Sequence, residues 1–175
     1  MRIILRIFFC LFVFTSCIKD GSKTPYEVVD FVDVGGLVPT FEVSDGDGNT
    51  FSSSDFIGKR SLLVLFETVC PDCGRVLPDI DKYVWSALKD DSDYLLVTIS
   101  RGEAAEVVNK YWADNKFTMP QYLDPGRQVF SKFASSTIPR LYIINKEGII
   151  EWKVIEELDI SIDELISLIK GQSTD

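Results

Sequence analysis

The sequence predicts a single α/β domain, with a central mixed β-sheet flanked by helices and an N-terminal β-hairpin extension. From Val38 onward, apolar runs of strand length alternate with stretches of helical periodicity. The run at residues 62–66 is wholly apolar, as expected for a central strand that is buried on both faces. Two turn sequences, SDGDGN and NKEG, each lie between strand-like runs and predict hairpins.

In the first half of the domain, local sequence patterns predict one helix and four strands. A helix is expected from Pro71 to about residue 88, because proline suits the first helical position. Pro78 lies inside this helix and should kink it. The strands expected in this half are at residues 40–43, 49–51, 62–66 and 94–99.

In the second half, two S-x-x-E patterns predict capping boxes at helix starts. Ser100 with Glu103 is expected to begin a helix that reaches about residue 115, and Ser161 with Glu164 the last helix. The other elements expected are a strand at 121–123, a short helix near 127–133 and strands at 140–145 and 149–154. The aromatic residues in helical patterns are expected to be core: Trp85, Tyr111 and Trp112.

Composition excludes several classes of function. The net charge is −9, and an acidic protein repels phosphate backbones, so we expect no nucleic-acid partner. The chain has no histidine, which removes the usual general base at neutral pH, Cys-His and Ser-His pairs and imidazole metal sites. We expect neither a metal nor another cofactor.

The first 16 residues have the form of a signal peptide, because Arg2 and Arg6 precede an unbroken apolar or small stretch. The run FTSC that ends at Cys17 resembles a bacterial lipobox. This resemblance implies cleavage before Cys17 and acylation of that cysteine. A segment that simply spans the membrane, and an ordinary cleaved signal that leaves Cys17 free, remain alternatives.

The expected organisation is therefore a lipoprotein signal peptide at 1–16, a lipidated tether at 17–36 and a folded domain at 37–175. The tether has glycine and proline and no sustained periodicity. The protein is expected in the bacterial cell envelope, as a lipoprotein anchored to the membrane and facing the periplasm.

Cys70 and Cys73 form a CxxC motif that follows the expected buried strand and opens a helix. The free N–H groups and the dipole of a helix N-terminus favour a thiolate there, and the thiolate is the attacking species in disulfide exchange. Cys70 is therefore expected to be the nucleophile. Cys73 would be the resolving residue, which attacks the Cys70 sulfur and releases a mixed disulfide.

Three other interpretations of this pair remain open. A structural disulfide would close only a four-residue loop, which removes little chain entropy. Half of a zinc or copper site would need further cysteine or histidine ligands. A peroxidatic cysteine of the peroxiredoxin kind has Pro seven residues, and Thr or Ser three residues, before it, where this chain has Leu63 and Glu67.

Two stretches, VPTFEVSDGDGNTFSSSDFIGKRSLLVLFETVCPDCGRVLPDI and LDPGRQVFSKFASSTIPRLYIINKEGII, are similar to the front and back halves of TlpA/ResA-type thioredoxin-like proteins of the AhpC-TSA-Redoxin superfamily. Together they cover most of residues 38–154. The resemblance implies a thioredoxin-like fold and thiol-disulfide oxidoreductase activity. It also implies that Pro139 is a cis proline lying against the cysteines, and that Ile138 offers backbone groups to an extended substrate segment.

The chain departs from this family at three positions. Val64 replaces a buried polar residue and Val69 an aromatic one, which leaves the proton relay to Cys73 unassigned. Glu67 could replace the relay, but strand parity predicts that it faces away from Val64 and is solvated. Arg140 replaces a small residue and is expected to influence which partner fits.

Within the motif, Pro71 and Asp72 are expected modulators, together with Glu67. The charge of Asp72 opposes a thiolate on Cys70, so we hypothesise a reductant supplied with electrons by a membrane donor. Its expected partners are disulfide-containing envelope proteins or a client of cytochrome maturation. The alternatives are a thiol peroxidase, and a non-catalytic binding module that keeps the fold, which Val64 and Val69 favour.

Overall fold

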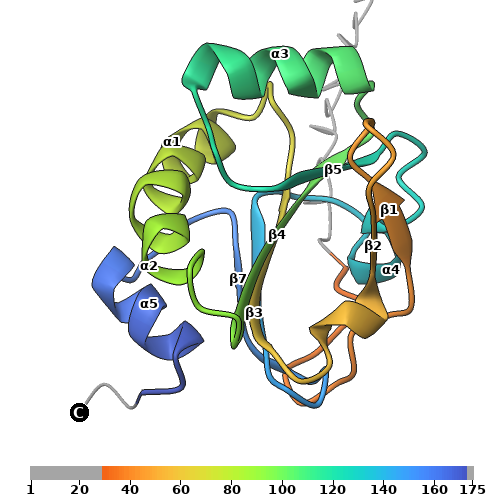
Figure 1. Ribbon diagram of the computed structural model, residues 1–175. Coiled ribbons are helices and arrows are strands. Elements are labelled where there is room, and N and C mark those ends of the chain that lie inside the picture. The colour runs from red at the N-terminus through yellow and green to blue at the C-terminus, as the bar shows by residue number, and fades with distance from the viewer. Residues whose placement is uncertain (1–28, 173–175) are drawn as a thin grey trace, which may run out of the picture.

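The computed structural model describes residues 29–172 (Figure 1). The predicted signal peptide, the predicted lipidation site Cys17 and most of the predicted tether lie outside these residues. Between residues 29 and 172, no helix combines the length and the apolar character needed to cross a membrane.

The predicted mixed sheet is confirmed, and it has seven strands in the order β2-β1-β5-β4-β3-β6-β7 (Figure 1). The central strand β3 pairs in parallel with β4 and antiparallel with β6, and β4 pairs in parallel with β5. The remaining pairs are antiparallel. The strands are β1 (Glu42–Ser44), β2 (Thr50–Ser52), β3 (Arg60–Phe66), β4 (Tyr94–Arg101), β5 (Gln121–Asp124), β6 (Arg140–Ile144) and β7 (Ile150–Ile155).

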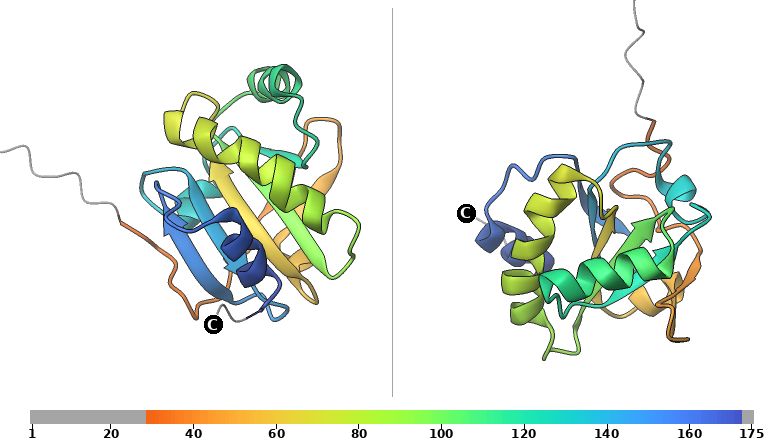
Figure 2. Two further views of the ribbon diagram at one scale, coloured as in Figure 1. Left: turned by 90° about the vertical axis from the view of Figure 1, so that its left-hand side faces the viewer. Right: turned by 90° about the horizontal axis from the view of Figure 1, so that it is seen from above.

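The helices cover both faces of this sheet. They are η1 (Ser53–Phe56), α1 (Pro71–Asp79), η2 (Ile80–Trp85), α2 (Ser86–Leu88), α3 (Ala105–Asn115), α4 (Phe130–Phe133) and α5 (Ile162–Ile169). Figure 1 shows α1, α2 and α5 on one face and α4 on the other, while α3 lies across the end of the sheet where β3 and β4 finish. Figure 2 shows α1 and α5 side by side over the sheet.

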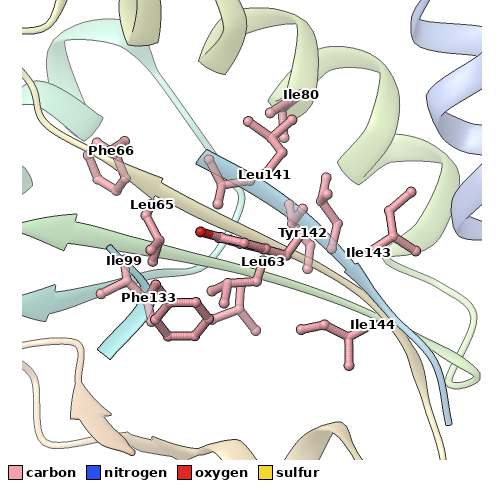
Figure 3. Close-up of a cluster of buried hydrophobic side chains, with 14 of the residues drawn as sticks. Leu63, Leu65, Phe66, Ile80, Ile99, Phe133, Leu141, Tyr142, Ile143 and Ile144 are labelled. Atoms are coloured by element: carbon pink, nitrogen blue, oxygen red, sulfur yellow. The ribbon is translucent and has the colours of Figure 1, made fainter. Parts of the chain in front are cut away.

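The hydrophobic core lies on both sides of β3 and β6. In Figure 3, Ile80 contributes from the side of α1 and Phe133 from the opposite side. Every residue of β3 after Arg60 is buried, because helices cover both faces of the strand. The prediction of a central buried strand is therefore confirmed.

The predicted kink at Pro78 takes the form of a π-helical segment. The helix that begins at Pro71 continues beyond Asp79 as the π-helix η2, and then as α2. Proline has no N–H to donate, and its ring crowds the preceding turn, so the regular bonding of the helix is interrupted near it.

Both predicted hairpins are confirmed. β1 pairs antiparallel with β2, and in the second turn Gly148 N donates to Asn145 O at 3.0 Å. Of the capping box predicted for the last helix, the structure shows the serine half, in which Ser161 Oγ accepts from Glu164 N at 3.1 Å.

The capping box predicted from Ser100 and Glu103 is wrong. β4 runs two residues further than the predicted end at residue 99, so Ser100 is a fully buried strand residue, and α3 begins only at Ala105. The pairing of β4 with β3 and β5 overrides the local pattern. The short helix predicted near 127–133 is also shorter than expected, at Phe130–Phe133.

Residues 29–36 pack against the domain, beside β7 (Figure 2). Phe31 N donates to Phe133 O at 2.8 Å, and Gly35 N donates to Ile150 O at 2.8 Å. Val32 is buried, with 7% of its surface exposed. The packed part of the chain therefore begins before residue 37, where the sequence placed the start of the domain.

Candidate active site

Cys70 is the N-cap residue of α1 and stands directly beyond the loop that leaves β3. Its Sγ accepts a hydrogen bond from the backbone N–H of Cys73 at 3.3 Å. Pro71 occupies the first turn, where its missing N–H costs nothing. A free N–H group of the first helical turn, that of Cys73, is thus directed at the sulfur, as in sites where a helix N-terminus binds an anion.

On its other side, Cys70 faces the loop that precedes β6. Its Sγ lies 3.7 Å from the carbonyl oxygen of Ile138, and the Ile138–Pro139 peptide bond is cis. The carbonyl of Pro139 accepts from Glu156 N at 2.9 Å, which ties this loop to the end of β7. The fold therefore brings together Cys70, Cys73, Ile138 and Pro139, the four residues that the family resemblance implied as one site.

The two sulfurs have different environments. Cys70 is partly exposed, whereas Cys73 is fully buried on the inner side of α1. Burial raises the pKa of the Cys73 thiol far above its ordinary value, and its hydrogen bond with Cys70 and the charge of Glu67 act in the same direction. Cys73 is therefore held as a neutral thiol, and Cys70 is the sulfur open to a visitor.

Both cysteines are free thiols in this structure. Among residues 29–172, no group of three histidine, cysteine, aspartate or glutamate side chains gathers closely enough to hold a metal ion. The pair has the geometry of a reactive dithiol at a helix start.

Glu67 is not the solvated residue that strand parity predicted. β3 ends at Phe66, so the alternation of the strand does not extend to Glu67. Its Oε1 accepts from Arg101 Nε at 2.5 Å, and only 22% of its side chain is exposed. Arg101 in turn stacks over the ring of Phe130 at 4.6 Å. Glu67 thus fixes the loop before Cys70 to the end of β4.

Glu103 holds the same loop from a second point, and the sequence analysis missed this role. Its carboxylate accepts from Thr68 N at 2.9 Å and from Thr68 Oγ1 at 2.6 Å. The S-x-x-E pattern was the only local signal at Glu103, and it indicated a helix cap instead. Residue 67 is therefore anchored to the end of β4, and residue 68 to the segment that joins β4 to α3.

The position of Val64 offers no proton relay. Val64 is fully buried, and its sheet partners are Thr98 and Leu141. The hydroxyl of Thr98 is already engaged, because it donates to Pro120 O at 2.7 Å. Val69, in contrast, is 79% exposed beside Cys70, so it presents an apolar contact surface next to the accessible sulfur.

The three aromatic residues expected in the core all pack against it. Trp112 is buried, while Trp85 and Tyr111 are half-buried. The hydroxyl of Tyr111 points toward the motif, because a methyl group placed on Gly74 would lie 3.9 Å from it. Burial raises the pKa of Tyr111, and the charges of Cys73, Cys70 and Glu103 act in the same direction.

Asp72 carries a negative charge two residues from Cys70, in the first turn of α1, but it is paired. Its carboxylate accepts from Arg75, and 36% of its side chain is exposed. A groove of about 370 Å³ lies beside this pair, between α1 and the segment that follows β7. Its walls combine acidic and apolar side chains, which include Asp72, Asp79, Val76, Glu156, Glu157, Leu158 and Ile160.

Arg140 does not reach the surface, where the sequence analysis expected it to affect partner choice. Its side chain is fully buried, and it bonds Ser136, Thr137 and Asp30 instead of solvent. A guanidinium group that is buried among carbonyls and a carboxylate is satisfied without a partner protein.

The sequence model of the AhpC/TSA family matches residues 34–153, a range that includes both cysteines and the Ile138–Pro139 loop.

The chain belongs to the AhpC/TSA family.

Within the AhpC/TSA family, the chain is similar to proteins named thiol-disulfide oxidoreductase ResA. The chain is 28% identical to thiol-disulfide oxidoreductase ResA of Geobacillus thermodenitrificans (strain NG80-2) over 67% of this chain and 66% of that protein. It is 27% identical to ResA of Bacillus subtilis (strain 168) over 80% of this chain and 78% of that protein. These relatives place the present AhpC/TSA member among the thiol-disulfide oxidoreductases.

Solved structures confirm the thioredoxin-like fold of this AhpC/TSA member. A Bacteroides thetaiotaomicron structure, described as a candidate protein disulfide isomerase, superposes with a TM-score of 0.72 at 30% identity and covers 80% of this chain and 87% of that one. The thioredoxin domain of a thiol-disulfide oxidoreductase from Bacteroides vulgatus gives a TM-score of 0.67 at 22% identity, covering 80% and 97% of the two chains.

Proposed function

We propose that this protein is a membrane-anchored thiol-disulfide oxidoreductase that exchanges disulfides with cell-envelope proteins through Cys70 and Cys73. The observation that carries the proposal is the position of Cys70 Sγ, which lies between the N–H of Cys73 at 3.3 Å and the carbonyl of Ile138 at 3.7 Å. The sulfur is thus placed between a helix N-terminus, which favours its anion, and a backbone edge, beside which a client polypeptide can lie.

The proposed reaction consists of two exchanges. The Cys70 thiolate attacks one sulfur of a client disulfide, a mixed disulfide forms, and the other client sulfur leaves as a thiolate. Cys73 then loses its proton and attacks the Cys70 sulfur, which releases the second client thiolate. The client gains two electrons, and the protein is left with a Cys70–Cys73 disulfide, which a donor dithiol must reduce.

The burial of Cys73 supports this division of roles. Because its pKa is raised, Cys73 remains a neutral thiol while Cys70 meets the client. A neutral, buried thiol does not compete for the client disulfide. It becomes the attacking group only once the mixed disulfide has formed beside it.

For clients, we propose disulfide-containing envelope proteins, including a client of cytochrome maturation. The exposed Val69 is the residue before Cys70, and the groove beside Asp72 borders the motif, so both provide contact area for a polypeptide. An extended segment that binds at Ile138 would use main-chain hydrogen bonds, which do not depend on the client's sequence.

A trapping experiment tests the proposal. In cells that express the Cys73→Ala variant, clients remain attached to Cys70 and appear as mixed disulfides that dithiothreitol releases. The Cys70→Ala variant is the matched control and should trap nothing. If Cys73→Ala also traps nothing, and the wild-type thiols do not interconvert with a disulfide in glutathione buffers, the protein is a binding module. Peroxide consumption by the purified protein without a client would instead identify a thiol peroxidase.

We propose that the pair works in the reducing direction, with electrons from a membrane donor. The charge of Asp72 opposes a second negative charge on Cys70, although Arg75 offsets part of this effect. An Asp72→Asn variant should therefore shift the glutathione equilibrium of the pair toward the dithiol, and Asp79→Asn, about two helix turns further along α1, should shift it less. A wild-type potential as oxidising as that of DsbA, at about −120 mV, would contradict this direction.

We also propose that Cys17 carries the lipid anchor and that residues 1–16 are removed. In cells fed a labelled fatty acid, the wild-type chain should be labelled and found in the membrane fraction. The Cys17→Ser variant should lose both the label and the membrane association, and a Cys17→Ser variant that still carries the label would refute the assignment.

A further inference from the structure

The N-terminal segment lies along the chain that leads to the Ile138–Pro139 loop. Asp30 forms a bridge with Ala134, and Ser135 N donates to Val29 O at 2.9 Å. In the reverse direction, Val29 N donates to Ser135 Oγ at 3.1 Å. These residues stand immediately before the loop whose carbonyl contacts Cys70. Two segments far apart in sequence therefore share one hydrogen-bonded border beside the site.

Arg140 joins that border to the loop itself. Its Nε donates to Thr137 O at 2.8 Å, and its Nη2 donates to Ser136 O at 2.8 Å. Its Nη1 donates to the carboxylate of Asp30. The side chain is fully buried, so water cannot reach the guanidinium. If one of these hydrogen bonds were lost, its donor would have no other partner. Arg140 thus holds the backbone directly before Ile138 in place through these hydrogen bonds.

Asp30 is fixed from a second direction. Its other carboxylate oxygen accepts from Lys153 Nζ at 2.9 Å, and the same ammonium group donates to Val32 O at 2.8 Å. Although partial burial acts to raise it, the hydrogen bonds with Lys153 and Arg140 hold the pKa of Asp30 below its ordinary value. The carboxylate therefore remains charged and balances the buried guanidinium at neutral pH.

The loop needs such a restraint, because its backbone does not have the usual conformation. Thr137 has a φ of 70°, in the left-handed region that non-glycine residues rarely adopt. Surrounding contacts must hold such a residue in place. The bond from Arg140 Nε to the carbonyl of Thr137 is one of these contacts.

We propose that Arg140 and Asp30 are positioning residues for client binding, which hold the backbone of residues 136–138 at the place where a client polypeptide binds beside Cys70. This inference rests on the proposed exchange function. It assigns a catalytic-site role to the segment that the sequence presented as a tether. Neither residue touches the client, and both act through the carbonyls that they fix.

The proposal separates two kinds of disulfide substrate. A peptide disulfide uses both the Cys70 sulfur and the backbone edge at Ile138. A small disulfide such as 2-hydroxyethyl disulfide has no peptide backbone and needs only the sulfur. Loosening the loop should therefore weaken binding of the first substrate and leave the reaction of the second nearly unchanged.

The test compares three single variants of the full chain, two at the proposed positions and one control. KM and kcat are measured on an oxidised Cys-X-X-Cys peptide, with dithiothreitol as the donor dithiol that reduces the Cys70–Cys73 disulfide after each turnover. Asp30→Asn keeps the size of the side chain and removes its charge, and Arg140→Met removes the guanidinium. We expect each to raise KM for the peptide about tenfold while the rate with 2-hydroxyethyl disulfide stays within about twofold. If Asp30 acts through Arg140, the double variant should resemble Arg140→Met alone.

Arg60→Met is the matched control. Arg60 also bonds two carbonyls and a carboxylate, those of Ile169, Leu168 and Glu151, but it stands at the opposite end of β3 from Cys70. It should lower stability and leave KM for the peptide unchanged. An equal rise of KM in Arg60→Met, or an unchanged KM in Asp30→Asn, would overturn the inference.

Failure of the inference and failure of the proposed function give different results. If the wild-type protein does not react with the peptide disulfide at all, the proposed function is wrong. If the wild type reacts and the Asp30→Asn variant matches it, only the positioning role is wrong. Should Arg140→Met not fold, Asp30→Asn still decides the question, and hydrogen exchange of residues 133–139 should be faster in that variant than in the wild type.

Discussion

Glu103 accepts hydrogen bonds from the backbone N–H of Thr68 at 2.9 Å and from its hydroxyl at 2.6 Å. Thr68 lies two residues before Cys70 in the chain. This contact holds the loop that places the accessible sulfur. Because Thr68 is half-buried, replacing Glu103 with alanine leaves two of its donors without their acceptor. We expect Glu103→Ala to lower the free energy of unfolding by about 1–3 kcal/mol, measured by urea denaturation.

Glu106 provides the control for this prediction. It is an exposed glutamate in the first turn of α3, where its charge interacts favourably with the helix dipole. Glu106→Ala should therefore cost only about 0.3–1 kcal/mol. Equal losses in the two variants would mean that the Thr68 contact contributes nothing of its own.

The raised pKa of Cys73 predicts how stability depends on pH. In the folded, reduced protein Cys73 keeps its proton, whereas in the unfolded chain it loses the proton above its ordinary pKa of 9.0. The unfolded state then binds fewer protons, so stability falls as pH rises above about 9, by up to about 1.4 kcal/mol per pH unit. Below that value, both states keep the proton and this contribution is constant.

Urea unfolding of the reduced wild type and of Cys73→Ala, between pH 7 and 10.5, measures this contribution. The tyrosines and lysines titrate in both proteins, so their effects cancel in the difference. The difference should be flat up to about pH 9 and then slope downward for the wild type. A difference that stays flat throughout would show that burial does not hold the proton on Cys73.

Replacing glycine with alanine should have opposite effects on stability at positions 74 and 148. Gly74 lies inside α1, and an added methyl would meet only the Tyr111 hydroxyl at 3.9 Å, an ordinary contact. Gly74→Ala should therefore stabilise the protein by about 0.5–1 kcal/mol. Gly148 has a φ of 78°, and its methyl would lie 2.9 Å from Ile57 Cδ1, so Gly148→Ala should destabilise by about 1–3 kcal/mol.

Thermal unfolding of the two variants side by side measures both signs. A lower melting temperature for Gly74→Ala would show that space near Tyr111 is tighter than the structure indicates. An unchanged melting temperature for Gly148→Ala would show that the hairpin turn rearranges without strain.

The side chain of Asp124 should stabilise the protein by accepting hydrogen bonds from the free N–H groups at the start of α4. Its Oδ2 accepts from Val129 N at 3.0 Å and from Phe130 N at 2.8 Å, at the start of α4. Replacing it with alanine should cost about 1–2 kcal/mol, in the range for a lost N-cap, and replacing it with asparagine should cost less. The order of the two midpoints in urea, with an unchanged m-value, checks this assignment.

Local sequence signals were sufficient where neighbours in the chain determine the structure. The start of α1 at Pro71 and the two hairpins follow from proline, glycine and asparagine at turn positions. The juxtaposition of Cys70 with Ile138 was predicted only through family resemblance, because the contact joins residues 68 positions apart.

Local signals failed where a distant partner decides the structure. Ser100 and Glu103 match a capping box, but strand pairing keeps Ser100 in β4 and leaves Glu103 free to bind Thr68. The pair of Asp30 and Arg140 is separated by 110 positions, and neither residue has a local pattern that points to the other. The buried position of Arg140 could not be read from a charge that is usually found at the surface.

The packing of Val29 and Asp30 against the domain also limits how far the active site can stand from a membrane. If Cys17 carries the anchor, the packed part of the domain begins 12 residues after it, at Val29, and not 20 residues after it, at residue 37. From residue 17 to residue 29 even a fully extended chain spans at most about 40 Å, against about 70 Å from residue 17 to residue 37. A protein whose anchor lies so close to its folded domain would react only with clients that come near the lipid surface.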